Sequence, residues 1–207
     1  MKSMIETILM PVSRFIRNET LKRRVSHLLR EKKEIFLEIG SGGRKGKNGW
    51  LTMDMSKNCD ICWDLRKGIP FPDGTVSRIY SSHFLEHLSF KEGREFLDEC
   101  LRVLVPEGVF LICVPNARIY IESYLMNVNL ENHIYLSYTQ AYNGTTKIDY
   151  VNYIAYMDGH HKYMFDEENL VFILKSKGFR NVRLREFDPT IDLKEREFQS
   201  IYAECKK

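Results

Sequence analysis

The sequence lacks any apolar run close to the roughly 20 residues that a membrane-spanning helix needs. Its first 19 residues have neither an uninterrupted apolar region nor a small-residue cleavage site, so we do not expect a signal peptide. Internal repeats and low-complexity segments are absent too. With 207 residues, 43% of them apolar and 29% charged, the chain fits one globular domain, and a cytoplasmic location is the default expectation.

The chain has too few cysteines, and an odd number of them, for a disulfide framework. Its five cysteines lie mostly inside apolar patterns, which favours reduced thiols. Cys59 and Cys62 form a CxxC pair, but no second pair or suitably spaced histidine accompanies it. We therefore expect no zinc site there.

Excess charge is also small, at a net +3, which gives no reason to expect DNA as a partner. It is unevenly spread, because residues 1–34 hold nine Lys/Arg against four Asp/Glu. The pattern predicts two short helices divided near Pro11, the second with Asn18 as its N-cap and an apolar stripe through Leu21, Val25 and Leu28. These helices are interpreted as an extension packed on the domain, with a substrate lid or peripheral membrane contact as alternatives.

Short apolar runs alternate with helical patterns from residue 35 onward. Runs at 35–39, 51–53, 76–80 and 109–114 have strand character. Ser89 and Glu92 have capping-box spacing ahead of an apolar helical stripe, and residues 106–108 are expected to end that helix. This alternation predicts an α/β fold with a mainly parallel sheet, which binds ligands at the carboxyl ends of its strands.

The pattern loosens over residues 117–163, which we interpret as an insertion on the substrate side. It holds nine of the eleven tyrosines: Tyr120, Tyr124, Tyr135, Tyr138, Tyr142, Tyr150, Tyr153, Tyr156 and Tyr163. Tyrosine has an apolar face and a polar tip, so this segment could stack on sugar rings or simply cap the core. A helix capped by Asp166 and ended by Gly178 follows, and two strands close the chain.

The stretch EIGSGG at residues 38–43 places a glycine turn at the end of the first strand. A phosphate-binding P-loop would need Lys followed by Ser or Thr after the last glycine, and none is present. A dinucleotide fingerprint would need a glycine where Lys45 stands and an acid about 20 residues on. Asp54 comes too early for that acid, so the sequence favours neither a P-loop nor a dinucleotide site.

An acid before the glycines, the turn Gly40-Ser41-Gly42 and an acid ending the second strand resemble class I S-adenosylmethionine (SAM)-dependent methyltransferases. The resemblance implies a Rossmann-like, mainly parallel seven-stranded sheet with helices on both faces, and a domain over residues 35–207. An acid after the second strand can accept both ribose hydroxyls. The cofactor-binding residues implied are Glu38, Gly40, Ser41, Gly42, Asp54, Asp64, Leu65, Ser82 and His83.

Further along, SSHFLEHL and HHKYMFDEENL resemble predicted methyltransferases of bacterial surface-glycan biosynthesis, the subfamily with Leu-Glu-His after the fourth strand. Two departures stand out. Arg44 replaces a glycine that is common in the class, where Arg44 or Lys45 could meet the ligand carboxylate. Only eleven residues separate Gly42 from Asp54, which leaves little room for a helix between the first two strands.

Histidines near these motifs are the candidates for chemistry, because a hydroxyl acceptor needs a base at neutral pH. His83 follows the fourth strand, and His160 and His161 precede the last helix. These three are the predicted catalytic residues. Glu86 and His87 are interpreted as structural, and no metal is predicted because no ligand spacing enforces one.

The sequence therefore predicts a methyltransferase that acts on a hydroxyl of a small molecule or glycan precursor. The signature of amino methylation on nucleic-acid bases is missing after the fourth strand. RNA methylation aided by the basic N-terminus, and a SAM-binding module without turnover, are the alternatives.

Overall fold

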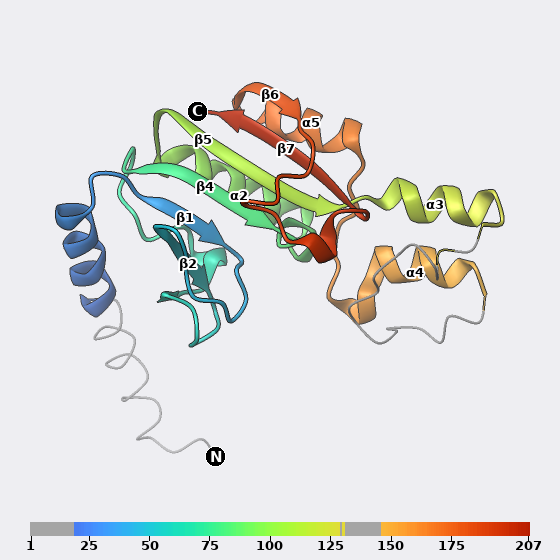
Figure 1. Ribbon diagram of the computed structural model, residues 1–207, viewed down its shortest axis with the longest axis horizontal. Coiled ribbons are helices and arrows are strands. Elements are labelled where there is room, and N and C mark those ends of the chain that lie inside the picture. Colours follow the sequence, from blue (N-terminus) through green and yellow to red (C-terminus); the bar gives the residue numbers. More distant parts are fainter. Residues whose placement is uncertain (1–18, 129, 131–145) are drawn as a thin grey trace, which may run out of the picture.

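The computed structural model describes residues 19–128, 130 and 146–207. A seven-stranded sheet runs through its centre in the order β3-β2-β1-β4-β5-β7-β6 (Figure 1). Strands β1 to β5 are parallel, and β7 is antiparallel to both β5 and β6. The strands are β1 Phe36–Ile39, β2 Trp50–Asp54, β3 Ile61–Cys62, β4 Val76–Ser82, β5 Leu104–Pro115, β6 Arg180–Leu184 and β7 Ser200–Lys206.

One face of the sheet packs against two helices, α2 (Phe90–Val103) and α5 (Glu167–Ser176). Ser89 caps α2 with both hydrogen bonds of a capping box, and Asp166 caps α5, as their spacing predicts. Alternate strand residues such as Leu37, Ile79 and Phe110 face these helices and are fully buried in the main core cluster. Burial of this face provides most of the apolar stabilisation of the domain.

The prediction of helices on both faces of the sheet is wrong for the connections between β1, β2 and β3. Residues 40–49 between β1 and β2, and residues 55–60 between β2 and β3, contain no helix, because they are too short to cross the sheet as one. The β6–β7 connection, residues 185–199, covers the opposite face instead. It packs Phe187 and Arg185 against the ring of Tyr202, and it contributes Asp192 to the hydroxyl of Tyr80.

Strand β5 begins earlier than the apolar run at 109–114 predicts. Leu104 directly follows α2 and already pairs with Val76 of β4, and a register shift follows before the regular pairing resumes. Residues 106–108 therefore lie within the strand rather than in a separate turn. The irregular pairing accommodates Glu107, which has a left-handed backbone (φ +62°).

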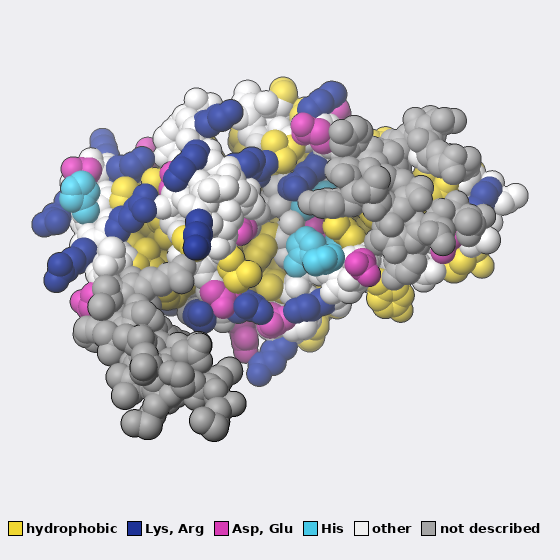
Figure 2. Space-filling view, turned by 90° about the horizontal axis from the view of Figure 1, so that it is seen from below, with side chains coloured by type: hydrophobic (Ala, Val, Ile, Leu, Met, Phe, Trp, Pro, Cys, Tyr) yellow, Lys and Arg dark blue, Asp and Glu magenta, His cyan; other side chains and the backbone are white. Residues whose placement is uncertain are grey.

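The described part of the N-terminal segment is a helix over residues 19–31. Val25 is buried in the main core cluster, and Leu21, Leu28 and Leu29 pack against it. The helix expected before Pro11 and the Asn18 cap lie outside the described residues. Basic side chains gather at this end of the molecule in the space-filling view (Figure 2).

Beyond the carboxyl end of β5, helices α3 (Ala117–Leu125) and α4 (Ile148–Tyr156) pack on each other (Figure 1). Tyr120 is fully buried between them, and its ring lies 6.0 Å from that of Tyr153. They form a second, smaller core cluster with Leu130 and Ile154. Residues 129 and 131–145 of the predicted insertion, with three of its tyrosines, lie outside the described residues. Among the helices of the described chain, none is long and apolar enough to cross a membrane.

Candidate active site

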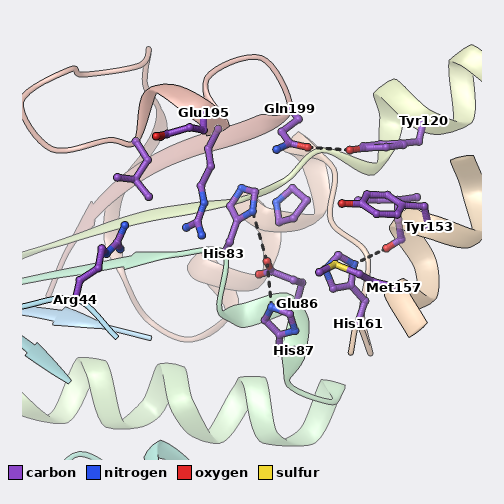
Figure 3. Close-up of a pocket in the computed structure, with 14 residues that line it drawn as sticks. Arg44, His83, Glu86, His87, Tyr120, Tyr153, Met157, His161, Glu195 and Gln199 are labelled. Carbon is purple, nitrogen blue, oxygen red and sulfur yellow. Dashed lines mark hydrogen bonds and ion pairs between the residues drawn. The ribbon is translucent and has the colours of Figure 1, made fainter. Parts of the chain in front are cut away.

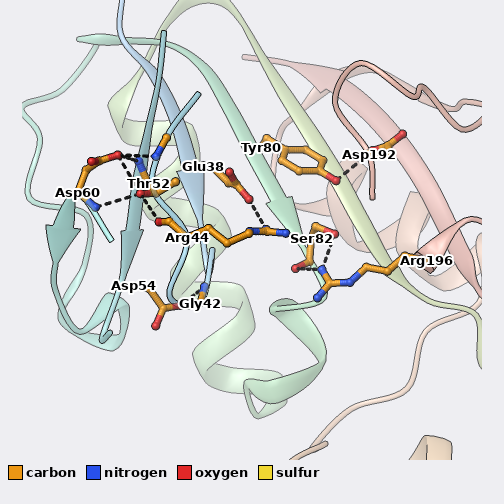
Figure 4. Close-up of polar contacts among 11 residues, drawn as sticks. Glu38, Gly42, Arg44, Thr52, Asp54, Asp60, Tyr80, Ser82, Asp192 and Arg196 are labelled. Carbon is orange, nitrogen blue, oxygen red and sulfur yellow. Dashed lines mark hydrogen bonds and ion pairs between the residues drawn. The ribbon is translucent and has the colours of Figure 1, made fainter. Parts of the chain in front are cut away.

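The glycine turn after β1 is fixed to the end of β2. Gly40 and Gly42 both have positive φ, +71° and +66°, which glycine adopts at no steric cost. The N–H of Gly40 donates to the carbonyl of Met53 (2.9 Å), and the N–H of Gly42 donates to Asp54 Oδ2 (3.0 Å). Asp54 Oδ1 accepts the N–H of Ser56 (3.1 Å). The glycines of the predicted site and Asp54, the acid at the end of β2, are thus brought together (Figure 4).

The short connection that follows contains Arg44, whose guanidinium donates to Glu38 Oε1. Buried Thr52 holds this connection, because its hydroxyl lies within hydrogen-bond distance of two acceptors, the Arg44 carbonyl (2.8 Å) and Asp60 Oδ2 (2.9 Å), and accepts the N–H of Asp60 (3.0 Å). Burial acts to raise the pKa of Asp60, but hydrogen bonds from Thr52 and Gly46 outweigh it and hold that pKa below its usual range. The missing helix is therefore replaced by an ordered loop.

Asp64 follows β3, as predicted, and caps the short 3₁₀ helix η1 (Leu65–Lys67). Its carboxylate accepts hydrogen bonds from Arg66 Nε (2.9 Å) and N–H (3.2 Å), and Lys67 lies 3.4 Å away. The hydrogen bond from Arg66 lowers the pKa of Asp64. Leu65 is buried beside it.

At the end of β4, Ser82 and His83 meet a residue from the far end of the chain. Arg196 donates to both the hydroxyl (2.8 Å) and the carbonyl (2.9 Å) of Ser82. His83 has φ +49°, and its Nε2 shares a hydrogen bond with Ser200 Oγ (2.8 Å). Burial, and then the charge of Arg196, hold the pKa of His83 well below its usual range, so the imidazole is neutral at neutral pH.

A cavity of about 380 Å³ opens beside His83, between the carboxyl ends of β4 and β5, helices α3 and α4, and the 185–199 segment (Figure 3). Its walls are mostly polar and aromatic. They comprise Arg44, His83, Glu86, His87, Pro115, Tyr120, Tyr153, Ile154, Met157, His161, Leu193, Glu195, Arg196 and Gln199. A second cavity of about 380 Å³ includes Glu38 and shares Arg44 and Leu193 with the first. The two cavities therefore adjoin at Arg44 and Leu193, and neither is lined by Gly40, Gly42 or Asp54.

Glu86 lies in the 3₁₀ helix η2 (Leu85–His87) on the cavity wall, with only 2% of its surface exposed. Its carboxylate faces His83 Nδ1 at 3.9 Å and His87 Nε2 at 3.8 Å. Burial raises the pKa of Glu86 to about 8, and burial lowers the pKa values of His87 and His161. Seen from below, histidine side chains lie in the middle of the surface, among hydrophobic and charged neighbours (Figure 2).

The three predicted catalytic histidines are not all together. His83 and His161 line the first cavity, and His161 is buried. His160 is exposed and is not among the residues lining it, although its backbone carbonyl contacts His87. Adjacent residues on an irregular segment point in different directions, which the dipeptide alone does not reveal.

Comparison with known proteins fits this geometry. Residues 47–112 match a family described as a methyltransferase domain. A segment of 57 residues is 40% identical to a Mycolicibacterium smegmatis protein described as a probable S-adenosylmethionine-dependent methyltransferase. Residues 47–112 thus match a SAM-dependent methyltransferase domain. SAM is the cofactor of this class.

The chain also resembles solved structures across most of its length. A SAM-dependent methyltransferase from Archaeoglobus fulgidus superposes with a TM-score of 0.53 at 19% identity, covering 92% of this chain and 94% of that one. One from Mesorhizobium loti gives 0.51 at 14% identity, covering 84% and 90%. These likenesses show the fold. The M. smegmatis match covers 26% of this chain and 21% of that protein, so the chain spans about a fifth of that relative.

Several residues of the first cavity carry no local sequence signal. Arg196 and Gln199 reach it from a connection more than 110 residues after Ser82, and Gln199 accepts the hydroxyl of Tyr120 (2.9 Å). Glu86 and His87 belong to the Leu-Glu-His segment but were interpreted as structural. The sequence does not reveal that the carboxyl of Glu86 is buried without a hydrogen-bond partner among the described residues.

Proposed function

We propose that the chain transfers the methyl group of SAM to a hydroxyl of a small molecule or glycan precursor. The observation that carries the proposal is the contact of the Gly42 N–H with Asp54, near a polar and aromatic cavity. SAM supplies a methyl group already activated on its sulfonium. Positioning of the acceptor can therefore contribute much of the acceleration, about 7–11 kcal/mol in well-oriented cases.

Two features of the glycine turn support binding of the cofactor. A Cβ on Gly42 would meet no heavy atom within 4 Å, so the backbone is open to a ligand. The hydroxyl of Ser41 is buried without a hydrogen-bond partner among the described residues. An orphaned buried hydroxyl beside an open backbone is a group that a polar ligand would satisfy.

In this proposal the cofactor residues keep the roles that the resemblance implies. Each oxygen of Asp54 already accepts one backbone N–H and retains a lone pair for a ribose hydroxyl. Arg44 lies where it can hold a carboxylate while it contacts Glu38. The remaining residues are Gly40, Ser41, Gly42, Asp64, Leu65, Ser82 and His83.

The acceptor is proposed to occupy the first cavity. Tyr120 and Tyr153 offer ring faces, and Gln199, Glu195 and Arg196 offer polar groups, a combination suited to sugar hydroxyls. His83 is neutral and buried at this wall, so it can hydrogen-bond an acceptor hydroxyl and receive its proton. Membership of the surface-glycan subfamily, a cytoplasmic location and peripheral membrane contact by residues 1–34 remain predictions.

Replacing Asp54 by alanine is expected to weaken binding of S-adenosylhomocysteine by about 10- to 100-fold, since hydrogen bonds to a charged group contribute about 1.5–3 kcal/mol. Isothermal titration calorimetry measures the change directly. Asp73→Ala is the matched control, because Asp73 is an exposed aspartate that pairs with Arg102 away from the turn. Equal affinities for the two variants would contradict the assignment of the turn.

Transfer itself is tested by incubating the protein with methyl-labelled SAM and separate panels of hydroxylated sugars and RNA. Label in the sugar panel supports the proposed acceptor. Label in RNA alone would overturn it in favour of RNA methylation. Tight binding of S-adenosylhomocysteine without label in any acceptor would indicate a binding module.

A further inference from the structure

The buried carboxylate of Glu86 is the most unusual group in the first cavity. Neither of its oxygens has a hydrogen-bond partner among the described residues, and both are inaccessible to solvent. The backbone of Glu86 is firmly held, because its carbonyl accepts the N–H groups of Lys162 (2.8 Å) and Tyr163 (3.3 Å). A buried carboxyl left without hydrogen-bond donors stays neutral unless a positive partner lies beside it, so a cation is the partner that would let it ionise.

Two histidines beside Glu86 offer lone pairs rather than protons. Nδ1 of His87 lies 3.0 Å from the carbonyl of His160, and Nδ1 of His161 lies 2.8 Å from the carbonyl of Ile154. A carbonyl only accepts, so each Nδ1 carries the proton and donates it. Nε2 of each neutral ring is then an unprotonated acceptor. A backbone carbonyl on the other ring nitrogen is the usual support of a metal-bound histidine.

The three groups converge on one point. One ligand atom from each of Glu86, His87 and His161 lies within 4.8 Å of the others. His87 Nε2 is 3.8 Å from Glu86 Oε1, and the two imidazole rings are 5.1 Å apart at 69° (Figure 3). Bonds of about 2.1 Å in a tetrahedral site separate ligand atoms by about 3.4 Å. A cation would therefore require shifts of less than about 1.5 Å.

We propose that Glu86, His87 and His161 form a binding site for a divalent transition-metal cation such as Zn²⁺. Two imidazole nitrogens and one carboxylate oxygen suit these cations better than Mg²⁺ or Ca²⁺, which prefer oxygen ligands alone. Three protein ligands leave a coordination position open, and all three residues line the first cavity. The site lies outside the glycine turn.

The open position faces the space assigned to the acceptor, and this step rests on the proposed function. A cation there would bind the acceptor hydroxyl through its oxygen and lower the pKa of that hydroxyl. His83, on the same cavity wall, would receive the proton, and the oxygen would keep the electron pair that methyl transfer requires. The proposed site would therefore select acceptors that have a hydroxyl able to bind the metal.

Titration of the metal-free protein with Co²⁺, followed by visible absorption, tests the site without relying on activity. We expect one equivalent to produce ligand-field bands of nitrogen and oxygen coordination, and Zn²⁺ to abolish them by displacement. Glu86→Gln and His161→Gln are expected to weaken Co²⁺ binding at least about 10-fold, as loss of a ligand exceeds the effect of losing its outer support. His160→Gln, in the exposed neighbouring histidine, should bind as the unaltered protein does.

The same variants separate metal binding from folding. Glu86→Gln keeps the shape of a buried carboxyl that has no hydrogen-bond partner among the described residues, so its Tm without metal should not fall below that of the unaltered protein, while its stabilisation by Zn²⁺ is lost. Absence of the bands in the unaltered protein would overturn the proposal. So would unchanged Co²⁺ affinity in Glu86→Gln, or the intense charge-transfer absorption of thiolate ligands. Binding of S-adenosylhomocysteine, measured separately, shows whether the cofactor assignment fails independently.

Discussion

Replacing Gly40 by alanine is expected to lower the free energy of unfolding by about 2–5 kcal/mol. At φ +71° a side chain is strained, and the new Cβ would lie 2.4–2.6 Å from Cβ, Cγ and Cδ2 of Phe84. Phe84 cannot rotate its own Cβ away, and its ring packs on Phe96 at 5.2 Å. The chain must therefore shift at the start of η2. For a domain of this size, Tm should fall by roughly 4–20 °C in a thermal melt.

Gly42→Ala is the matched control, since Gly42 has nearly the same φ but open space around it. Only backbone strain of about 1–2 kcal/mol is expected there. Its main effect should be on S-adenosylhomocysteine binding, because the added methyl group occupies the space beside Asp54. Equal losses of Tm in the two variants would show that contact with Phe84 does not limit position 40.

Arg185→Ala is expected to reduce the free energy of unfolding by about 3–5 kcal/mol, because it leaves the buried carboxylate of Asp192 without its positive partner. Arg185 is 12% exposed, and its guanidinium donates to both oxygens of Asp192, at 2.6 and 2.7 Å. The Asp192 side chain is fully buried and also accepts the hydroxyl of Tyr80 (3.0 Å). Urea unfolding followed by circular dichroism measures the loss.

Arg183→Ala provides the comparison from the same region of the chain. Arg183 is 71% exposed and pairs with Glu204 at the surface, so its loss should cost less than about 1 kcal/mol. Adding Asp192→Asn to Arg185→Ala should recover part of the lost stability, because it removes the stranded charge. If the two arginine variants lose the same stability, the pair with Asp192 does not hold the 185–199 segment on the sheet.

Much of the fold was predictable because its signals are local. The capping box of α2, the Asp166 cap of α5, and the apolar runs that became β1, β2 and β4 need only neighbouring residues. The short distance from Gly42 to Asp54 also predicted correctly that no helix joins β1 to β2. The cover of the second sheet face was not predictable. It depends on Tyr80 meeting Asp192, which lies 112 residues away and has no spacing signal.

The candidate site also has parts that the sequence predicts and parts that it does not. The glycine turn and Asp54 are close in sequence, and their contact follows from strand order. The local sequence predicts neither the hydrogen bond of Arg196 with Ser82 nor the burial of His161 beside an exposed His160. Both depend on tertiary packing. The interpretation of Glu86 as structural does not include its burial, because an acid on a short helix is ordinarily solvated.

The 185–199 segment gives this fold a particular evolutionary constraint. The same connection that shields Tyr80 and Tyr202 also supplies Leu193, Glu195, Arg196 and Gln199 to the cavity wall. Substitutions that alter which acceptor fits will therefore tend to lower the stability of the sheet, and new specificities should arise together with compensating core substitutions. Exchanging the whole segment, with its Arg185–Asp192 pair kept intact, is the route by which selectivity can change without that loss.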